Sequence, residues 1–129
     1  MASSRSLALV AEDTELGRWA IAHALQAVGF EFYLSAGWVE SAGWLDRADF
    51  AVAVMALACD RDDVGHIVRH VEGRHHRTRL IVLAAQDDVA AVRNEAGPDI
   101  IVLPKPIDVG RVVFAVKSVT EPGAVALGA

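Results

Sequence analysis

Short apolar runs alternate with longer amphipathic stretches five times along the chain. Several of the short runs are continuously apolar, which is typical of parallel strands that are buried on both faces. They occupy residues 6–11, 30–35, 50–56, 80–84 and 100–103. Each is followed by a stretch whose apolar residues recur every three or four positions. The pattern therefore predicts five strand-and-helix units in succession.

The amphipathic stretches predict helices because their apolar residues fall on one side of a 3.6-residue period. They occupy residues 14–28, 37–47, 62–73, 87–96 and 108–119. The first is expected to bury a face formed by Leu16, Ala20, Ala24 and Val28, with Ile21 and Leu25 beside it. The last is apolar enough that we expect it to bury more than one side.

Five alternating units with short connections predict an α/β fold with a parallel sheet and helices on both faces. The expected architecture is a flavodoxin-like (βα)5 three-layer sandwich, with five strands in the order 2-1-3-4-5. Functional groups of such folds gather at the carboxyl ends of the strands. Residues 1–120 are expected to form one domain, and residues 121–129 a disordered tail or the start of a linker.

Composition narrows the class of protein. The 129 residues are 53% hydrophobic and 22% charged, which predicts a globular domain. The net charge of −5 argues against a nucleic-acid-binding role, although residues 69–79 hold four arginines and three histidines. No apolar run is long enough to span a membrane, and the single Cys59 suits a reducing compartment. We expect a cytoplasmic domain with no membrane or nucleic-acid partner.

Three charged residues stand at predicted strand ends, where chemistry would be expected. Glu12 and Asp13 follow the first strand, and Lys105 follows the last between two prolines. Adjacent carboxylates can hold a hard cation, or they can cap a helix. A lysine at the same edge can meet a phosphoryl oxygen, or it can be a solvated surface residue. Pro106 restricts the backbone of Lys105, and the bond between them could be cis.

Together these landmarks resemble the receiver domain of response regulators, over roughly residues 6–119. The strand and acidic pair Leu9-Val10-Ala11-Glu12-Asp13, the step Gly29-Phe30, the pair Ala96-Gly97 and the run Leu103-Pro104-Lys105-Pro106 carry the resemblance. The resemblance implies Mg²⁺ at the acidic pair and a two-component phosphorelay in which a histidine kinase phosphorylates an aspartate. It also implies a switch hydroxyl, a switch aromatic residue, and dimerisation through the fourth and fifth helices.

The residues that would perform this switching are absent at the matching positions. Counted from Asp49, the phosphoacceptor position falls on Val54, with Met55 as the neighbouring alternative. The switch hydroxyl position is Ala84. The switch aromatic position is Val102, or Ile101 in the competing alignment. The resemblance thus predicts an atypical receiver domain that is not an enzyme and acts through a protein partner or a homodimer. Glu12 and Asp13 alone form an incomplete Mg²⁺ site, so no cofactor is expected. Lys105 could instead pair with Glu12 or Asp13.

Other hypotheses remain open from the sequence. Asp60, Asp62 or Asp63 could be a displaced phosphoacceptor. A small-molecule-binding flavodoxin-like protein is a further alternative, although residues 11–17 contain no glycine-rich phosphate loop.

Two further groups of side chains have a structural and a functional interpretation. His66 and His70 have the spacing of a zinc-binding pair, or they belong to a solvated basic helix end. Trp38 and Trp44 are either interface anchors or part of the core.

Overall fold

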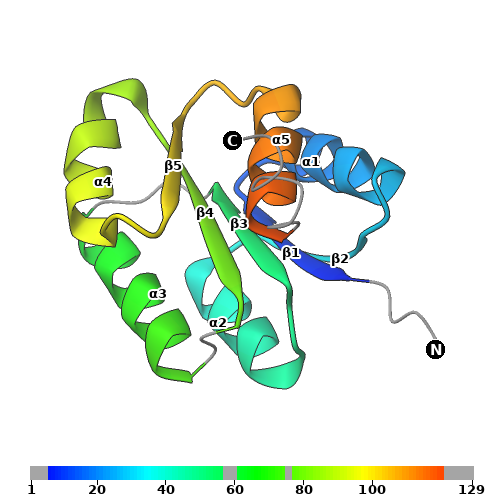
Figure 1. Ribbon diagram of the computed structural model, residues 1–129, viewed down its shortest axis with the longest axis horizontal. Helices are drawn as coiled ribbons and strands as arrows, with labels where there is room; N and C mark the ends of the chain where they lie inside the picture. The colour runs from blue at the N-terminus through cyan, green and yellow to red at the C-terminus, as the bar shows by residue number, and fades with distance from the viewer. Residues whose placement is uncertain (1–5, 57–60, 75–76, 121–129) are drawn as a thin grey trace.

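The chain folds as a parallel sheet between two layers of helices (Figure 1). The computed structural model describes residues 6–56, 61–74 and 77–120. Within these residues the strands are β1 (Leu7–Glu12), β2 (Glu31–Ser35), β3 (Val52–Ala56), β4 (Arg79–Ala84) and β5 (Ile101–Pro104). The helices are α1 (Glu15–Ala27), α2 (Trp38–Arg47), α3 (Arg61–Arg74), α4 (Val89–Ala96) and α5 (Val109–Thr120), with a short 3₁₀ turn, η1 (Gln86–Asp88), before α4.

All neighbouring strands run parallel, in the order β2-β1-β3-β4-β5. This is the predicted order, and it leaves β2 and β5 as the two edges. Parallel pairing places every strand's carboxyl end on the same side of the sheet. Glu12 is paired in register with Ala56, and Ala84 with Pro104. The loops after these strands therefore converge at one edge, which is called the carboxyl edge below.

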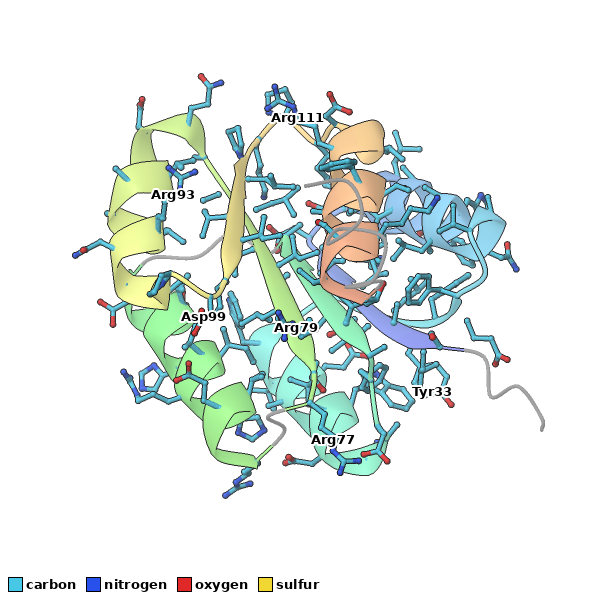
Figure 2. All side chains as sticks on the ribbon, viewed as in Figure 1. Tyr33, Arg77, Arg79, Arg93, Asp99 and Arg111 are labelled. Carbon is cyan, nitrogen blue, oxygen red and sulfur yellow. The ribbon has the colours of Figure 1, made fainter. Side chains whose placement is uncertain are left out.

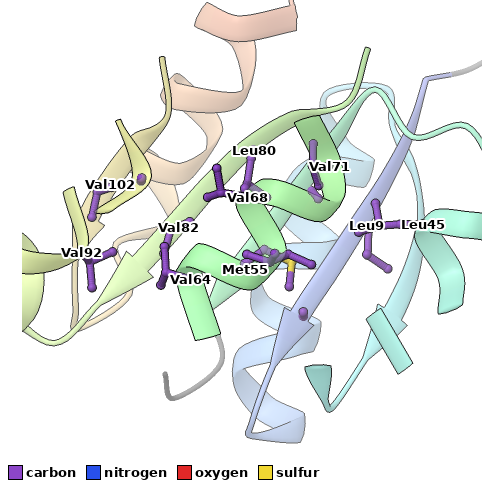
Figure 3. Packing of buried hydrophobic residues seen from close by; sticks show 14 of the residues in the cluster. Leu9, Leu45, Met55, Val64, Val68, Val71, Leu80, Val82, Val92 and Val102 are labelled. Carbon is purple, nitrogen blue, oxygen red and sulfur yellow. The ribbon is translucent and has the colours of Figure 1, made fainter. Parts of the chain in front are cut away.

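The two faces of the sheet bury separate apolar clusters, because successive side chains of a strand point to opposite sides. One cluster holds Leu9, Met55 and Val82 against α2, α3 and α4 (Figure 3). The other holds Val10, Val54 and Ile81 against α1 and α5. Burial on both faces explains why the central strands read as continuous apolar runs in the sequence.

The five predicted helices and strands are all present, with ends that differ from the prediction by up to two residues. The predicted buried face of α1 was wrong in part. Ile21, Ala22 and Leu25 are buried, whereas Ala20 is exposed and Leu16 is 83% exposed. Both faces satisfy a helical period, and contact with β1 and β2 selected the one that excludes Leu16. The prediction for α5 was also wrong, because Phe114 lies outside its single buried face and is 75% exposed.

Two other predictions depend on this fold. The predicted tail at residues 121–129 lies outside the described residues.

Trp38 and Trp44 are both half-buried and pack against the core, which favours the structural interpretation of these side chains. No helix among the described residues is long and apolar enough to cross a membrane.

The buried hydroxyl of Thr78 offers a test of how the sheet is held at its amino end. Thr78 Oγ1 donates a hydrogen bond of 2.8 Å to the backbone oxygen of Phe50. Thr78→Val removes the donor and leaves a buried carbonyl unpaired, so we expect the free energy of unfolding to fall by roughly 1–3 kcal/mol in chemical denaturation. The matched control is Thr120→Val, at a half-buried helix end whose hydroxyl bonds Val116 O. An equal loss in both variants would contradict this role for Thr78.

Candidate functional site

The acidic pair at the end of β1 is divided between two environments. Glu12 is the last residue of the strand and only 4% exposed. Its side chain follows Ala8 and Val10 in the strand alternation and so lies on the α1 face. Asp13 is exposed in the connection to α1. The two carboxylates therefore do not form one equivalent pair.

The buried carboxylate of Glu12 is held by the residue that caps the next helix. Its Oε2 accepts hydrogen bonds of 2.6 Å from both the backbone N–H and the hydroxyl of Thr14. Thr14 is the N-cap of α1, and its Oγ1 accepts a 3.0 Å bond from Gly17 N. In a capping box the N-cap N–H is bonded by an acidic residue at the third helical position. Here glycine occupies that position, and Glu12 bonds the N–H from the strand side.

Gly17 is required by the position of this carboxylate. A Cβ atom at residue 17 would collide with Glu12 Oε2 and lie 2.8 Å from Glu12 Cδ and from Thr14 Oγ1. The sequence analysis missed this contact. The sequence did contain a signal for it: the N-cap Thr14 is followed three residues later by Gly17, where an acidic residue is common.

Arg18 was also missed, and it fixes the backbone of the acidic pair. Its Nη1 donates hydrogen bonds of 2.8 Å to the carbonyl oxygen of Glu12 and 3.3 Å to that of Asp13. The guanidinium thus ties the first turn of α1 to the end of β1. The sequence pattern could not identify Arg18, because its partners are backbone atoms and such contacts leave no pattern of residue types.

Lys105 enters the site from the end of β5. Its backbone N–H donates a 2.8 Å bond to Ala84 O, and its bond to Pro106 is cis. The ammonium Nζ lies 3.9 Å from Glu12 Oε1, with side-chain exposures of 28% and 6% for the two residues. The expected pairing of Lys105 with Glu12 therefore has an ion-pair distance. The Glu12 carboxylate has donors on one oxygen and a cation beside the other.

The predicted phosphoacceptor position, Val54, is fully buried and lies before the carboxyl edge. It pairs in register with Val10 and Ile81 and packs on the α1 and α5 face. Met55, the alternative position, packs on the opposite face. The β3 residue in register with Glu12 is Ala56. Both predicted positions, and Ala56 beside Glu12, are thus apolar.

The two other predicted switch positions are buried on the face of the sheet opposite to that of Glu12. Ala84 ends β4, and Val102 lies within β5. Both belong to the cluster that packs against α3 and α4. Glu12 is therefore separated from them by the sheet, although Ala84 shares the carboxyl edge.

The alternative sites differ in how far the structure describes them. Asp63 is half-buried on α3, whereas Asp60 and the side chain of Asp62 lie outside the described part of the chain. His70 Nε2 lies 3.0 Å from Asp46 Oδ1, which joins α3 to α2. Residues 6–56, 61–74 and 77–120 contain no group of three or more His, Cys, Asp or Glu side chains arranged to hold a metal ion.

Substitution of Gly17 tests the contact with Glu12. Alanine normally stabilises a helix interior by roughly 0.5–1 kcal/mol relative to glycine. We expect that gain from Gly43→Ala in α2, where an added Cβ meets no atom within 4 Å. Gly17→Ala should instead lower the free energy of unfolding, measured by urea denaturation. In a Glu12→Ala background the same change should become favourable, and an unchanged penalty there would contradict the contact.

Comparison with known proteins gives matches among solved structures. No family model matches the chain, and no curated protein does. A response regulator from Thermotoga maritima has a TM-score of 0.76 at 17% identity, covering 92% of this chain and 99% of that one. The receiver domain of the sensor histidine kinase PA1611 from Pseudomonas aeruginosa, with magnesium in its active-site cleft, gives 0.75 at 18% identity, covering 92% and 99%.

An orphan response regulator of Helicobacter pylori, HP1043, gives a TM-score of 0.71 at 13% identity, covering 89% of this chain and 96% of that one. Identities this low relate these proteins by architecture. The matches extend over almost the whole length of each neighbour. The strand order β2-β1-β3-β4-β5 and the two helical layers are those expected for the receiver fold. The chain has the fold of a response-regulator receiver domain.

Proposed function

We propose that this chain is a receiver-like signalling domain that works without phosphorylation and acts through protein contacts in a bacterial two-component-type pathway. The observation that carries the proposal is the environment of Glu12. Its carboxylate is bonded by Thr14 and lies beside the Lys105 ammonium, while the β3 residue in register with it is Ala56. Glu12 and Lys105, which the resemblance assigns to metal and phosphoryl binding, thus lie within ion-pair distance of one another.

A bound Mg²⁺ fits these residues poorly. Mg²⁺ needs near-octahedral oxygen ligands. Glu12 Oε2 already accepts two hydrogen bonds, and Ala56 supplies no side-chain ligand from β3. Asp13 is exposed and would have to supply most of the charge. We therefore propose that the domain functions without a metal cofactor.

The last helix and strand offer a surface for a protein partner. A hollow of about 520 Å³ beside β5 and α5 is lined by Ile101, Leu103, Asp108, Gly110, Arg111, Phe114, Ala115 and Ser118. Phe114 projects from it with 75% of its surface exposed, and large exposed aromatic side chains are favoured at interfaces. We propose that a signalling partner docks there. The homodimer through α4 and α5 that the resemblance implies stays a prediction for the same region.

The same observations bear on enzymatic activity and on the class of partner. The apolar side chains of Val54, Met55 and Ala56 and the pairing of Glu12 with Lys105 support a non-enzymatic role, which we propose to be cytoplasmic. The net charge of −5 supports a protein partner over a nucleic acid.

Incubation with acetyl phosphate and Mg²⁺ tests the absence of phosphorylation. We expect the intact mass of the chain to stay unchanged, because Val54, Met55 and Ala56 cannot form an acyl phosphate. A triple variant, Asp60→Asn with Asp62→Asn and Asp63→Asn, is the control. A phosphoryl mass gain that this variant abolishes would establish a displaced acceptor and refute the proposal.

Replacement of Lys105 tests whether the retained charges stabilise one another. Lys105→Met leaves the buried Glu12 carboxylate without its neighbouring cation, so we expect a loss of roughly 1 kcal/mol in the free energy of unfolding. The matched control is Lys117→Met on the exposed side of α5, which should change stability by less than about 0.5 kcal/mol. The Lys105 effect should shrink when Glu12 is replaced by Gln. Equal effects of both lysine variants would count against the pairing.

A further inference from the structure

Aromatic side chains gather around one edge of the sheet. Six of the chain's eight aromatic residues lie on β2, next to it or against it, namely Trp19, Phe30, Phe32, Tyr33, Trp44 and Phe50. Trp19 meets Phe32 edge to face on the α1 side, and Tyr33 packs on Trp44 with ring centroids 4.5 Å apart on the α2 side. Trp19 and Tyr33 remain about two-fifths exposed, at 41% and 40%. The edge is therefore bordered by aromatic surface on both faces.

The outer backbone groups of β2 are those of Phe32 and Leu34. Glu31 N donates to Ser6 O, which points the backbone of Glu31 toward β1. Backbone groups alternate in direction along a strand, so those of Phe32 and Leu34 point away from the sheet. Among the residues that the structure describes, these outward groups have no hydrogen-bond partner. An edge strand in this state can pair with another strand.

The opposite edge of the sheet is protected in part by the chain itself. Lys105 N donates to Ala84 O, so the alternation points the backbone of Val102 and Pro104 outward from β5. Arg93 Nη2 donates a 3.2 Å hydrogen bond to Val102 O, and Pro104 has no N–H to offer. Figure 2 shows Arg93 beside β5 and Tyr33 at the far edge. On β5 one outward carbonyl is bonded and one N–H is missing, whereas the outward N–H and C=O groups of Phe32 and Leu34 on β2 all lack such protection among the described residues.

We propose that the partner at this edge is a second copy of the chain, whose β2 pairs antiparallel with the first across a two-fold axis at Tyr33. Phe32 of each copy then lies opposite Leu34 of the other. Both residues have outward backbone groups, so this register uses all four groups of each copy in four hydrogen bonds. A register centred on Phe32 would set Leu34 opposite Phe30, and one centred on Leu34 would set Phe32 opposite Ala36, and the N–H groups of Phe30 and Ala36 are already bonded to Leu25 O and Glu40 Oε1. The self-pairing is therefore specified by the strand itself.

The side chains brought together by this register are compatible. Phe32 meets Leu34, Tyr33 meets its own copy, and Glu31 meets Ser35, so no like charges stand directly opposite. A hollow of about 530 Å³ lies at the start of β2, lined by Gln26, Gly29, Phe30, Glu31 and Phe32. The same register brings residues 36–37 of the second copy to this hollow. The surface on α5 that was proposed for a signalling partner stays uncovered.

Sedimentation equilibrium of the full chain and of charged variants tests the pairing. The wild type should form a concentration-dependent dimer. Tyr33→Lys places two ammonium groups across the two-fold axis and should weaken the dimer by roughly tenfold or more. Val39→Lys is the matched control, because Val39 is 89% exposed on α2 and lies off the edge. It makes the same change of charge and should leave the dimer intact.

Cross-linking tests the register even if Tyr33→Lys disturbs folding. At a two-fold antiparallel position the two Cβ atoms lie about 4.5–5.5 Å apart, near the range that a disulfide spans. In a Cys59→Ser background, Tyr33→Cys should give a covalent dimer on mild oxidation, and Val39→Cys should not.

Three results would overturn the proposal. They are a wild type that stays monomeric at the highest attainable concentration, equal cross-linking at residues 33 and 39, and a dimer that Phe114→Asp dissociates while Tyr33→Lys does not. The last would place the dimer on α5 and leave the phosphorylation-independent function untouched.

Discussion

Burial of one carboxylate at the junction of β1 and α1 is the constraint on which the carboxyl edge depends. A buried charge is stable only when it is bonded and compensated. Glu12 meets that condition through the N–H and hydroxyl of Thr14, the Lys105 ammonium nearby and the space left by Gly17. The same contacts begin the first helix and draw the end of the last strand toward the first. The Glu12 side chain thus contacts both the residue that caps α1 and the lysine that follows β5.

This arrangement supports the proposal that the domain works without phosphorylation. A phosphorylation switch needs a site whose charges are incompletely compensated until the phosphoryl group arrives. Here the compensation is supplied within the chain, and the positions implied for the switch hydroxyl and aromatic residue, Ala84 and Val102, belong to an apolar cluster. Apolar packing at these positions has one favoured arrangement, because a close-packed interior tolerates few alternatives.

The fold could be predicted from the sequence because hydrophobic periodicity reports burial directly, and five strands buried on both faces admit few topologies. The site could be predicted only in part. Glu12 and Lys105 were identified by their places at strand ends. The position of Glu12 also depends on Gly17, which has no Cβ to collide with its carboxylate, and on Arg18, which bonds its backbone oxygen. Hydrophobic periodicity records neither contribution. Counting from Asp49 led to Val54, whereas the hydrogen-bonded register with β1, which sequence does not reveal, sets Ala56 beside Glu12.

The hydrogen bond from Arg93 to the backbone of β5 has a consequence for how large an assembly of this chain can become. A sheet with two open edges can accept a new copy at each end, and growth by strand addition then has no natural limit, as in fibres. On β5 the bond from Arg93 occupies one outward carbonyl and Pro104 removes one N–H, so this edge offers fewer free groups to a further strand than β2 does. If the proposed pairing of β2 forms, it uses the more open edge of each copy, and the bond from Arg93 on a neighbouring helix then disfavours growth beyond two copies.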